Sequence, residues 1–381
     1  MVILDLKLKN ILAFDDFHIC FSYPRKLGKS LLENENLSSV PSFRYKKLNI
    51  IVGSNATGKT SLFRIIVSVL RFLATGEKRF IECLLRSNKE EGSIQIDFVS
   101  KEEKEPKYFL HRVNIKTNTD SNSELTILIS HKLLSIKSPD SYEKLVTSLD
   151  SMAGQYNDYR VYFARKENFG FSDIKMALPA TEPSFDRFTF IHGLDSEDKK
   201  DYLSILNSIL KTLDPSIKEV APSKDSDNAY VLSYEDGEKI IVQEGNTLSD
   251  IPLLSSGTKY GFNLANMVYA IKHHLNSIYL VDEQFAYISS DIEVALLGTM
   301  VELLGDDEQL FFTTHNSNIL SMGFPFHSFY FLRKVKIGEK REIQVSCASE
   351  LENRNNISPY NMYENDMFAS APDLSLIYSI K

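Results

Sequence analysis

The sequence predicts an α/β fold with an N-terminal antiparallel β-layer and an inserted α+β lobe. Residues 2–23 alternate between apolar and polar side chains, which is the period of half-buried strands. Short, mainly apolar runs at 48–52, 278–281 and 309–314 are typical of parallel strands buried on both faces. The long stretch 77–250 mixes both kinds of spacing, with neither sustained heptads nor an internal repeat.

The first segment, 1–76, is expected to contain a hairpin or meander, a loop, a strand and a helix. Residues 24–45 are polar and rich in Pro, Gly and Ser, which favours a loop. After the strand at 48–52, apolar residues recur at helical spacing from Ser61 to Leu73. A strand, a glycine-rich turn and a helix are therefore expected in direct succession.

Residues 77–250 are predicted to form the inserted lobe. Alternating stretches indicate paired strands, and Asp236-Gly237 is a strong signal for a tight hairpin turn. The predicted strands cover 93–99, 108–115, 125–129, 159–163, 230–234 and 239–243, and the predicted helices cover 141–152 and 198–213.

The last segment, 251–381, returns to helices followed by buried strands. This order is that of α/β cores, so the segment is expected to complete the core that residues 1–76 begin. The predicted helices cover 261–274, 292–304 and a short stretch at 373–380, the strands cover 278–281 and 309–314, and a final hairpin covers 326–332 and 343–347.

Composition and charge limit what the chain can do. The formal net charge of −8 argues against coating nucleic acid through bulk charge, but it is compatible with a local basic groove that binds a nucleic-acid partner. Cys20, Cys83 and Cys347 are far apart and form no CxxC pair, which suits a reducing cytosol and gives no sign of a zinc site. The charged N-terminus is unlike a signal peptide, and the apolar runs are too short to span a membrane. We therefore expect a cytoplasmic protein without a membrane partner.

A glycine-rich segment fits the pattern GxxxxGK[ST] at every fixed position. Gly53 and Gly58 let the backbone wrap around a phosphate without a Cβ clash. Lys59 can reach the β- and γ-phosphates of a nucleotide, and Thr60 can offer its hydroxyl to Mg²⁺. An ordinary glycine turn needs neither the strand before it nor the periodic helix after it, so we predict a nucleotide site. Its predicted residues are Gly53, Ser54, Asn55, Ala56, Thr57, Gly58, Lys59, Thr60 and Ser61.

Two adjacent carboxylates follow the buried strand at 278–281. Asp282 would hold Mg²⁺ through water, and Glu283 would polarise the attacking water. Strands that end in solvated carboxylates are common, so the pair alone does not decide between the two interpretations. Its position downstream of the phosphate-binding loop favours the catalytic one.

The segment Leu254-Ser255-Ser256-Gly257-Thr258 lies directly before a predicted helix and shortly before the acidic pair. Such a segment can bind an anion through the helix N–H groups, although an ordinary N-cap explains the same residues. Its place in the motif order favours an anion site at Ser255, Ser256 and Gly257.

His315 follows the last buried strand, 309–314. A histidine at the carboxyl end of a strand can hydrogen-bond a γ-phosphate and sense its loss, whereas most single histidines are structural. The strand-end position favours the functional interpretation.

The order of these four motifs resembles that of the ABC-type ATPases. More narrowly, it is similar to the prokaryotic ABC-like "AAA family" ATPases related to the OLD proteins and to ATPase subunits of anti-phage systems such as Septu and retron-associated modules. Asn55 in the loop and Thr258 after Ser256-Gly257 are typical of that group. The resemblance implies an α/β P-loop NTPase fold, an ABC-type ATPase head with an N-terminal antiparallel β-layer and an inserted α+β lobe.

The resemblance also implies a site that two copies share. Two heads would join head-to-tail around ATP and Mg²⁺, as a homodimer or a higher homo-oligomer, and hydrolysis would release them. Ser255 and Gly257 of one copy would contact the γ-phosphate bound by the other. The implied catalytic residues are Lys59, the base Glu283 and the switch histidine His315. The implied partner is a separate effector, a nuclease in bacterial anti-phage defence.

Three features of the sequence depart from the family pattern. Gln95 and Gln155 are the candidates for the glutamine that contacts Mg²⁺ in relatives, and neither is assigned. Tyr287-Ile288-Ser289 stands where many relatives have Leu-His-Pro, so slow hydrolysis is expected. The segment after His315 is too short for the Toprim nuclease of the OLD proteins, so a separate nuclease is expected.

Three functions follow from these observations. The first is an ATP-driven switch ATPase that regulates or drives an effector. The alternative is an ATP-stabilised scaffold with little hydrolysis that holds an effector inactive, and turnover measured with and without Glu283 separates the two. The long middle region and the unassigned glutamine argue against a third, the nucleotide-binding subunit of a transporter.

Overall fold

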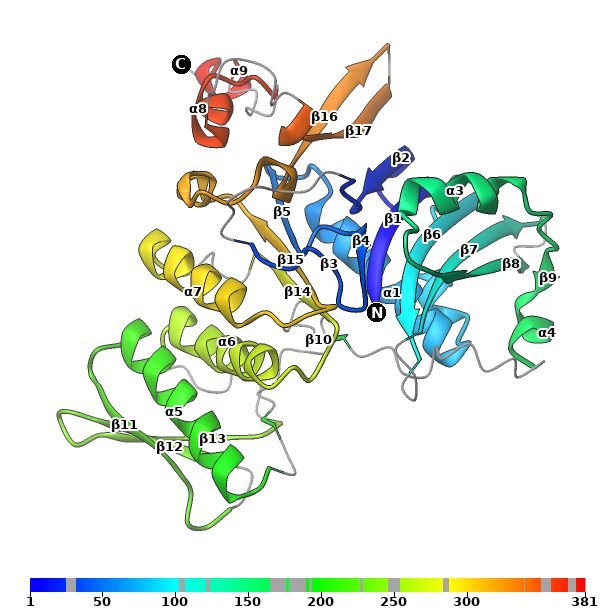
Figure 1. Ribbon diagram of the computed structural model, residues 1–381. Helices are drawn as coiled ribbons and strands as arrows, with labels where there is room; N and C mark the ends of the chain where they lie inside the picture. Colours follow the sequence, from blue (N-terminus) through cyan, green and yellow to red (C-terminus); the bar gives the residue numbers. More distant parts are fainter. Residues whose placement is uncertain are drawn as a thin grey trace. The chain divides into compact units, whose positions relative to one another are not determined.

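The computed structural model describes residues 1–24, 32–102, 107–120, 124–164, 176–177, 190–191, 194–226, 229–245, 254–283, 288–338, 340–350, 358–368 and 375–380. The chain divides into two compact units, Met1–Lys175 with Asp306–Lys381, and Met176–Gly305. Their helices and strands are labelled in Figure 1. The first unit holds the glycine-rich loop and His315, and the second holds the acidic pair.

An antiparallel sheet forms one layer of the first unit. Its strands are β1 (Val2–Ile11), β2 (Phe14–Cys20), β6 (Glu91–Lys101), β7 (Tyr108–Thr119), β8 (Leu125–Ile136) and β9 (Asn157–Asp158). The strand order is β2-β1-β6-β7-β8-β9. Buried apolar side chains meet across the register, for example Leu6 opposite Ile96 and Ile96 opposite Val113. The predicted N-terminal antiparallel layer is thus confirmed.

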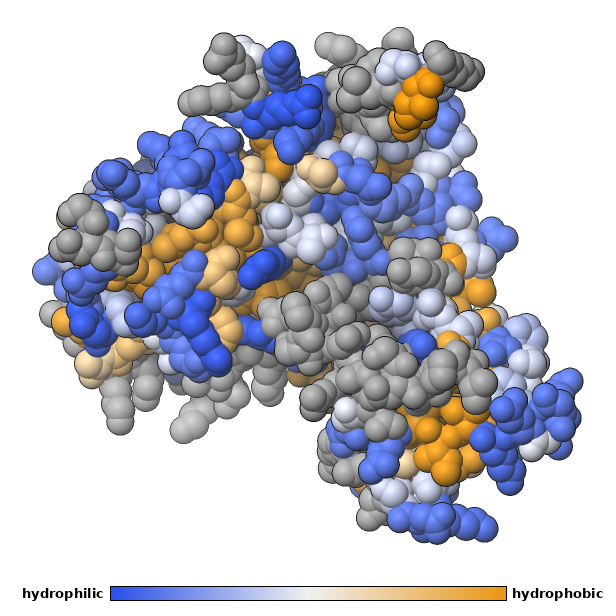
Figure 2. Space-filling model, turned by 180° about the vertical axis from the view of Figure 1, so that it is seen from behind, coloured by the Kyte–Doolittle hydropathy of each residue, from blue (hydrophilic) through white to orange (hydrophobic). Residues whose placement is uncertain are grey.

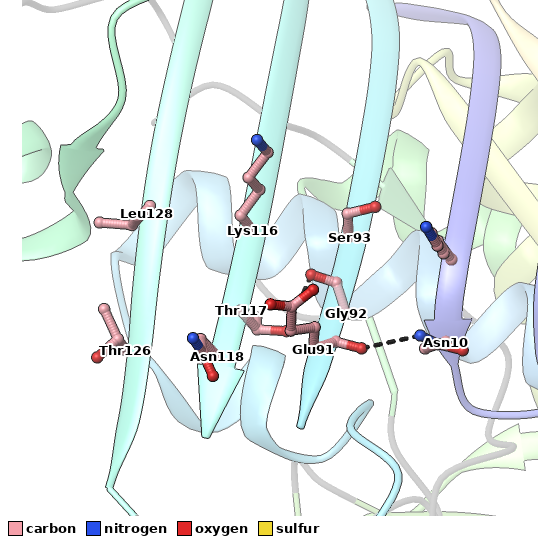
Figure 3. A pocket seen from close by; sticks show the side chains of 10 residues that line it. Asn10, Glu91, Gly92, Ser93, Lys116, Thr117, Asn118, Thr126 and Leu128 are labelled. Atoms are coloured by element: carbon pink, nitrogen blue, oxygen red, sulfur yellow. Dashed lines mark hydrogen bonds between the residues drawn. The ribbon is translucent and has the colours of Figure 1, made fainter. Parts of the chain in front are cut away.

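Polar side chains gather at one end of this sheet. They line a hollow of about 380 Å³. Figure 3 shows the lining side chains on β1, β6, β7 and β8. Asn10 Nδ2 donates a hydrogen bond to the Glu91 carbonyl oxygen at 3.1 Å. Glu91 and Lys116 are both exposed. Because both charge signs face solvent, we interpret this surface as a solvated sheet face.

The second sheet of the first unit is centred on β5 (Leu48–Gly53). β15 (Gln309–Thr314) and β16 (Phe329–Ile337) flank β5 and run parallel to it, and β17 (Lys340–Cys347) pairs antiparallel with β16. Every residue of β5 and β15 is buried, as the apolar runs predict. The helix α1 (Lys59–Thr75) follows β5. The predicted succession of strand, glycine-rich turn and helix is therefore confirmed.

The strand predicted at 159–163 is wrong, because these residues belong to the helix α4 (Tyr159–Ala164). Phe163 packs edge-on against Phe72 of α1, with the ring centroids 5.4 Å apart. Packing against a neighbouring helix has outweighed the strand preference of an aromatic and β-branched run.

The loop predicted at 24–45 contains a small hairpin in its described part. Its strands are β3 (Asn36–Leu37) and β4 (Val40–Arg44), and Leu37 and Phe43 are fully buried. Other short elements of the first unit are α2 (Arg79–Glu82), α3 (Tyr142–Ser151), η4 (Ser317–Ser321), η5 (Phe326–Ser328), η6 (Ala348–Glu350), α8 (Pro359–Glu364) and α9 (Ser375–Tyr378).

The second unit packs helices against an antiparallel sheet. The helices are α5 (Ser196–Leu213), α6 (Ser256–Lys272) and α7 (Ser290–Leu303), the sheet is β11 (Ile217–Pro222), β12 (Ala229–Tyr234) and β13 (Lys239–Gln243), and β10 (Met176–Ala177) pairs parallel with β14 (Ile278–Asp282). Gly237 has a φ of 92°, which confirms the predicted hairpin turn. Gly261 lets α5 and α6 approach closely, because a Cβ there would lie 2.6 Å from Leu210 Cδ2.

The compact units divide the chain differently from the predicted segments 1–76, 77–250 and 251–381. Strands β6 to β8 share a sheet with β1, whereas α6 and α7 group with Met176–Gly305. The compact units group residues that contact one another, whereas the predicted segments describe where a lobe is inserted along the chain. The three segments therefore stay a prediction.

The surface is predominantly hydrophilic on the side shown in Figure 2, where blue side chains surround smaller orange areas. Of the described helices, none combines the length and the apolar character that a membrane crossing needs. Most large apolar side chains that the structure describes lie in the two cores.

Two neighbouring histidines are held in the antiparallel sheet. His111 Nδ1 lies 3.0 Å from His131 Nε2, and His111 Nε2 lies 2.7 Å from Ser100 Oγ. Burial lowers the pKa of His111 to about 3, with a smaller contribution from His131, and burial lowers the pKa of His131 to about 4. Both rings are therefore neutral in the native protein at neutral pH.

We expect the free energy of unfolding to fall as the pH falls from 6.5 to about 4. In this window the unfolded chain binds protons that the two native histidines do not bind, so stability rises with pH. Each histidine contributes a slope of up to about 1.4 kcal/mol per pH unit. Urea unfolding at pH 7 and pH 5 measures the effect. His111→Gln should flatten the slope; an equal slope in the wild-type protein and in His111→Gln would contradict this.

Candidate nucleotide site

The glycine-rich loop is positioned by β5 and α1. Ala56 has a φ of 62° and Gly58 a φ of 96°, so the loop twice enters the left-handed region. Thr57 Oγ1 donates to the Ser54 carbonyl oxygen at 2.7 Å, which fixes the turn between them. Backbone N–H groups in such a curved segment can converge on one anion. The local geometry is therefore that of a phosphate-binding loop.

The N-terminus of α1 opens into this loop. Gly58 is the N-cap and provides no side-chain cap hydrogen bond, and the first turn has no acidic residue. The first N–H groups of a helix have no partner within the helix and carry a partial positive charge. Thr60 is exposed and Ser61 is half-buried in this first turn. The helix end is thus suited to an anion, as predicted for a nucleotide phosphate.

The glycine requirement is steric at two positions. A Cβ on Gly53 would lie 2.6 Å from Thr57 Oγ1 and 2.7 Å from the Leu332 carbonyl oxygen. A Cβ on Gly58 would lie 2.8 Å from Ile343 Cδ1, and its positive φ adds strain. The sequence motif predicted both glycines, but no local signal marked Leu332 and Ile343 as their neighbours.

Lys59 is buried inside the loop, with 3 % of its surface exposed. Its Nζ donates to the carbonyl oxygens of Gly53 at 2.6 Å and Ser54 at 3.1 Å. The same cation is thereby held next to the loop amides, where a triphosphate group would sit. This position is compatible with the predicted role of Lys59 as a phosphate ligand, which stays a prediction.

The strand register brings His315 to the same edge as the loop. Thr314 pairs with Val52 in the parallel β15–β5 ladder, so His315 follows at the level where the loop begins. His315 is exposed. The structure thus brings together the glycine-rich loop and His315, which are far apart in sequence.

The acidic pair ends β14 in the second unit. All five residues of β14 are buried, and Asp282 is 5 % exposed. Glu283 is half-buried and has a φ of 47°. A non-glycine residue in the left-handed region is strained, and such residues are concentrated at functional sites. Tyr287 is the first residue of the Tyr-Ile-Ser sequence that differs from the family pattern, and it lies outside the described residues.

Ser255 is the N-cap of α6. Its Oγ accepts a hydrogen bond from the Thr258 backbone N–H at 3.1 Å and lies 2.7 Å from Thr258 Oγ1. Ser255 and Ser256 are exposed, and Gly257 is half-buried. Capping and a surface position are both compatible with a later contact to a nucleotide on a second copy. The roles of Ser255, Ser256, Gly257, Asp282 and Glu283 in nucleotide binding stay predictions.

The two candidate glutamines occupy different settings. Gln95 lies in the middle of β6, opposite Lys7 and Asn114, and its Nε2 is buried without a hydrogen-bond partner. Gln155 is exposed between α3 and β9. Gln95 is therefore a sheet residue, and the glutamine of the predicted site stays unassigned.

One protein family matches the chain. A family model described as "AAA domain" matches residues 5–240, which include the glycine-rich loop. No curated protein matches the chain.

Among solved structures, the chain is similar to an SMC head domain from Thermotoga maritima, at 14 % identity and a TM-score of 0.42 over 91 % of this chain and 99 % of that chain. It is also similar to an SmcHead bound to the C-winged helix domain of ScpA, at 13 % identity and a TM-score of 0.46 over 92 % of this chain and 99 % of that chain. A third similar structure is a Smc head domain with an extended coiled coil, bound to the C-terminal domain of ScpA derived from Pyrococcus furiosus. The identity is 13 % and the TM-score is 0.46, over 92 % of this chain and 98 % of that chain.

We expect Lys59→Ala to abolish nucleotide binding. The loop amides remain in this variant, but the loop loses the buried cation that can follow the β- and γ-phosphates. Titration with a fluorescent ATP analogue measures the affinity. Lys9→Ala, at an exposed lysine of β1, is the matched control and should bind normally. An unchanged affinity for the ATP analogue in Lys59→Ala would contradict this interpretation of the loop.

Proposed function

Because the chain belongs to the AAA domain family and has the predicted α/β fold of an ABC-type P-loop ATPase head, we propose that it is an ATP-dependent switch enzyme. ATP and Mg²⁺ bind at the glycine-rich loop, two heads join head-to-tail around ATP, and hydrolysis releases them. The observation that carries this proposal is the β15–β5 register, which places His315 beside a loop whose buried cation is Lys59.

The residues of the loop have defined roles in this proposal. Lys59 and the first N–H groups of α1 hold the phosphates, and Thr60 and Asp282 hold Mg²⁺. Glu283 orients and polarises the attacking water, and its left-handed backbone conformation supports a functional rather than a packing role. His315 contacts the γ-phosphate and responds to its loss.

The partner we propose is a separate effector, a nuclease of bacterial anti-phage defence. The support is the order of the four motifs, with Asn55 and Thr258 at positions typical of that group. A motif order is an argument by analogy. Plaque counts in cells that carry this gene with its neighbours, compared with the Lys59→Ala gene, test the role; equal protection by both genes would contradict it.

The alternative is a scaffold that binds ATP stably and holds an effector inactive. The observation in its favour is that Gln95 is held inside β6, so the glutamine that contacts Mg²⁺ in relatives is unassigned. Such a protein would bind ATP through the same loop and release phosphate slowly. Turnover separates it from the switch enzyme, because only the switch depends on repeated hydrolysis.

We expect Glu283→Gln to keep ATP binding and to stall hydrolysis. The amide is nearly isosteric with the carboxylate but cannot act as a base, so the ATP-bound form should accumulate. Phosphate release gives the rate, and a fluorescent ATP analogue gives the affinity. Glu302→Gln, at an exposed carboxylate of α7, is the control. Turnover at the wild-type rate in Glu283→Gln would show that another residue is the base.

We also expect two inactive variants to complement each other when they are mixed. A dimer of Lys59→Ala with Ser255→Arg has one site with both lesions and one intact site. That intact site takes Lys59 from the Ser255→Arg copy and Ser255 from the other copy. Independent sites should restore a fraction of the ATPase activity.

Strictly coupled sites would leave the mixture inactive but still able to pair with ATP, which light scattering detects. Each variant alone is the control. The shared-site proposal fails if the mixture shows neither activity nor pairing while the wild-type protein hydrolyses ATP as a strict monomer.

A further inference from the structure

Two adjacent lysines precede β5, and their surroundings differ. Lys46 is 5 % exposed and Lys47 is 7 % exposed. Burial lowers the pKa of Lys47, and the nearby carboxylates of Asp306, Glu308 and Glu35 oppose that effect. Acidic groups of the protein therefore offset part of the cost of burying the charge of Lys47.

Lys46 has different neighbours. Its Nζ donates to the Cys20 carbonyl oxygen at 3.2 Å and to Cys347 Sγ at 3.6 Å, and it lies 4.5 Å from the centroid of the Tyr330 ring. The Cys347 Sγ also donates to the His327 carbonyl oxygen at 3.6 Å. Among the described residues, no carboxylate forms an ion pair with Lys46. A buried ammonium without a counter-charge is costly.

The Lys46 side chain lines a cavity of about 370 Å³ in the first unit. The hydroxyls of Ser22 and Ser349 also line it, and each is hydrogen-bonded to a neighbouring cysteine thiol, at 3.3 Å and 3.1 Å. Glu350, the one carboxylate among the described lining residues, is exposed. The volume is in the range of sites for small organic molecules, and Lys46 supplies a buried charged hydrogen-bond donor to it.

We propose that this cavity binds a small organic anion, with its carboxylate or phosphate group on Lys46 and its remainder against Tyr330 and Val345. The buried ammonium repels cations, so it argues against a metal ion held by Cys20 and Cys347. The described residues likewise contain no cluster of three or more His, Cys, Asp or Glu side chains that could hold a metal. The cavity lies at the amino end of β5, whereas the glycine-rich loop follows its carboxyl end, so the two sites are separate.

The first test measures anion binding in full-length Lys59→Ala protein, which removes the main competing anion site. Inorganic phosphate and succinate are titrated separately, by thermal unfolding and calorimetry. At least one should raise the melting temperature to a plateau, and the comparison identifies the preferred head group. Adding Lys46→Met should weaken that binding by at least about tenfold, because a charge-assisted hydrogen bond is lost. Lys47→Met, at the adjacent and equally buried lysine, should retain it.

The second test locates the anion without changing Lys46, so it decides the question even where Lys46→Met does not fold. Alkylation by iodoacetamide is followed by mass spectrometry. The anion should slow the alkylation of Cys20. The anion concentration that gives half of this effect should equal the concentration that gives half of the shift in melting temperature. The alkylation of the exposed Cys83 should not change. The proposal is overturned by the absence of a plateau with either probe, by equal affinity in Lys46→Met, or by a melting shift that leaves Cys20 alkylation unchanged.

Discussion

The candidate site depends on the burial of β5 between two parallel neighbours. The register pairs Thr314 with Val52 on one side and Leu332 with Gly53 on the other. Because side chains alternate along a strand, a slip of one residue would turn every side chain of β5 to the opposite face. The same slip would separate the start of the loop from His315. Every residue of β5 is buried, so the hydrophobic core fixes the register from which the site is built.

Three buried lysines surround this strand, and the protein compensates the charge of each in a different way. Lys59 donates to two loop carbonyls at the carboxyl end of β5. Lys47 lies among carboxylates, including Glu35 and Asp306. Lys46 has a carbonyl oxygen, a thiol and an aromatic face. Buried charges are costly unless they are paired. Lys46, for which the described residues show no ion pair with a carboxylate, is therefore where the protein has most to gain from an anionic ligand.

The sequence predicts the site where its parts are contiguous and fails where distant segments meet. Apolar spacing is enough to identify the strand, turn and helix around the loop, because that geometry is local. No local pattern indicates that Ile343 lies against Gly58, or that Cys20 and Cys347 reach the same lysine. The error at 159–163 has the same origin, since packing against α1 decided the conformation. The glycine-rich motif carries the site prediction because its chemistry resides mainly in the backbone.

A shared site has a thermodynamic consequence that the loop alone would not have. If Ser255 and Gly257 of one copy contact the γ-phosphate held by the other, ATP binds the dimer more tightly than the monomer. By linkage, ATP must then strengthen dimerisation by the same factor. Ser255 is exposed at the surface of its own copy, even though its Oγ caps α6. Loss of the γ-phosphate removes the contact that couples the two equilibria, so hydrolysis weakens the dimer without any change in the loop. A switch of this kind therefore needs no conformational change in the buried β5, whose register the core holds fixed.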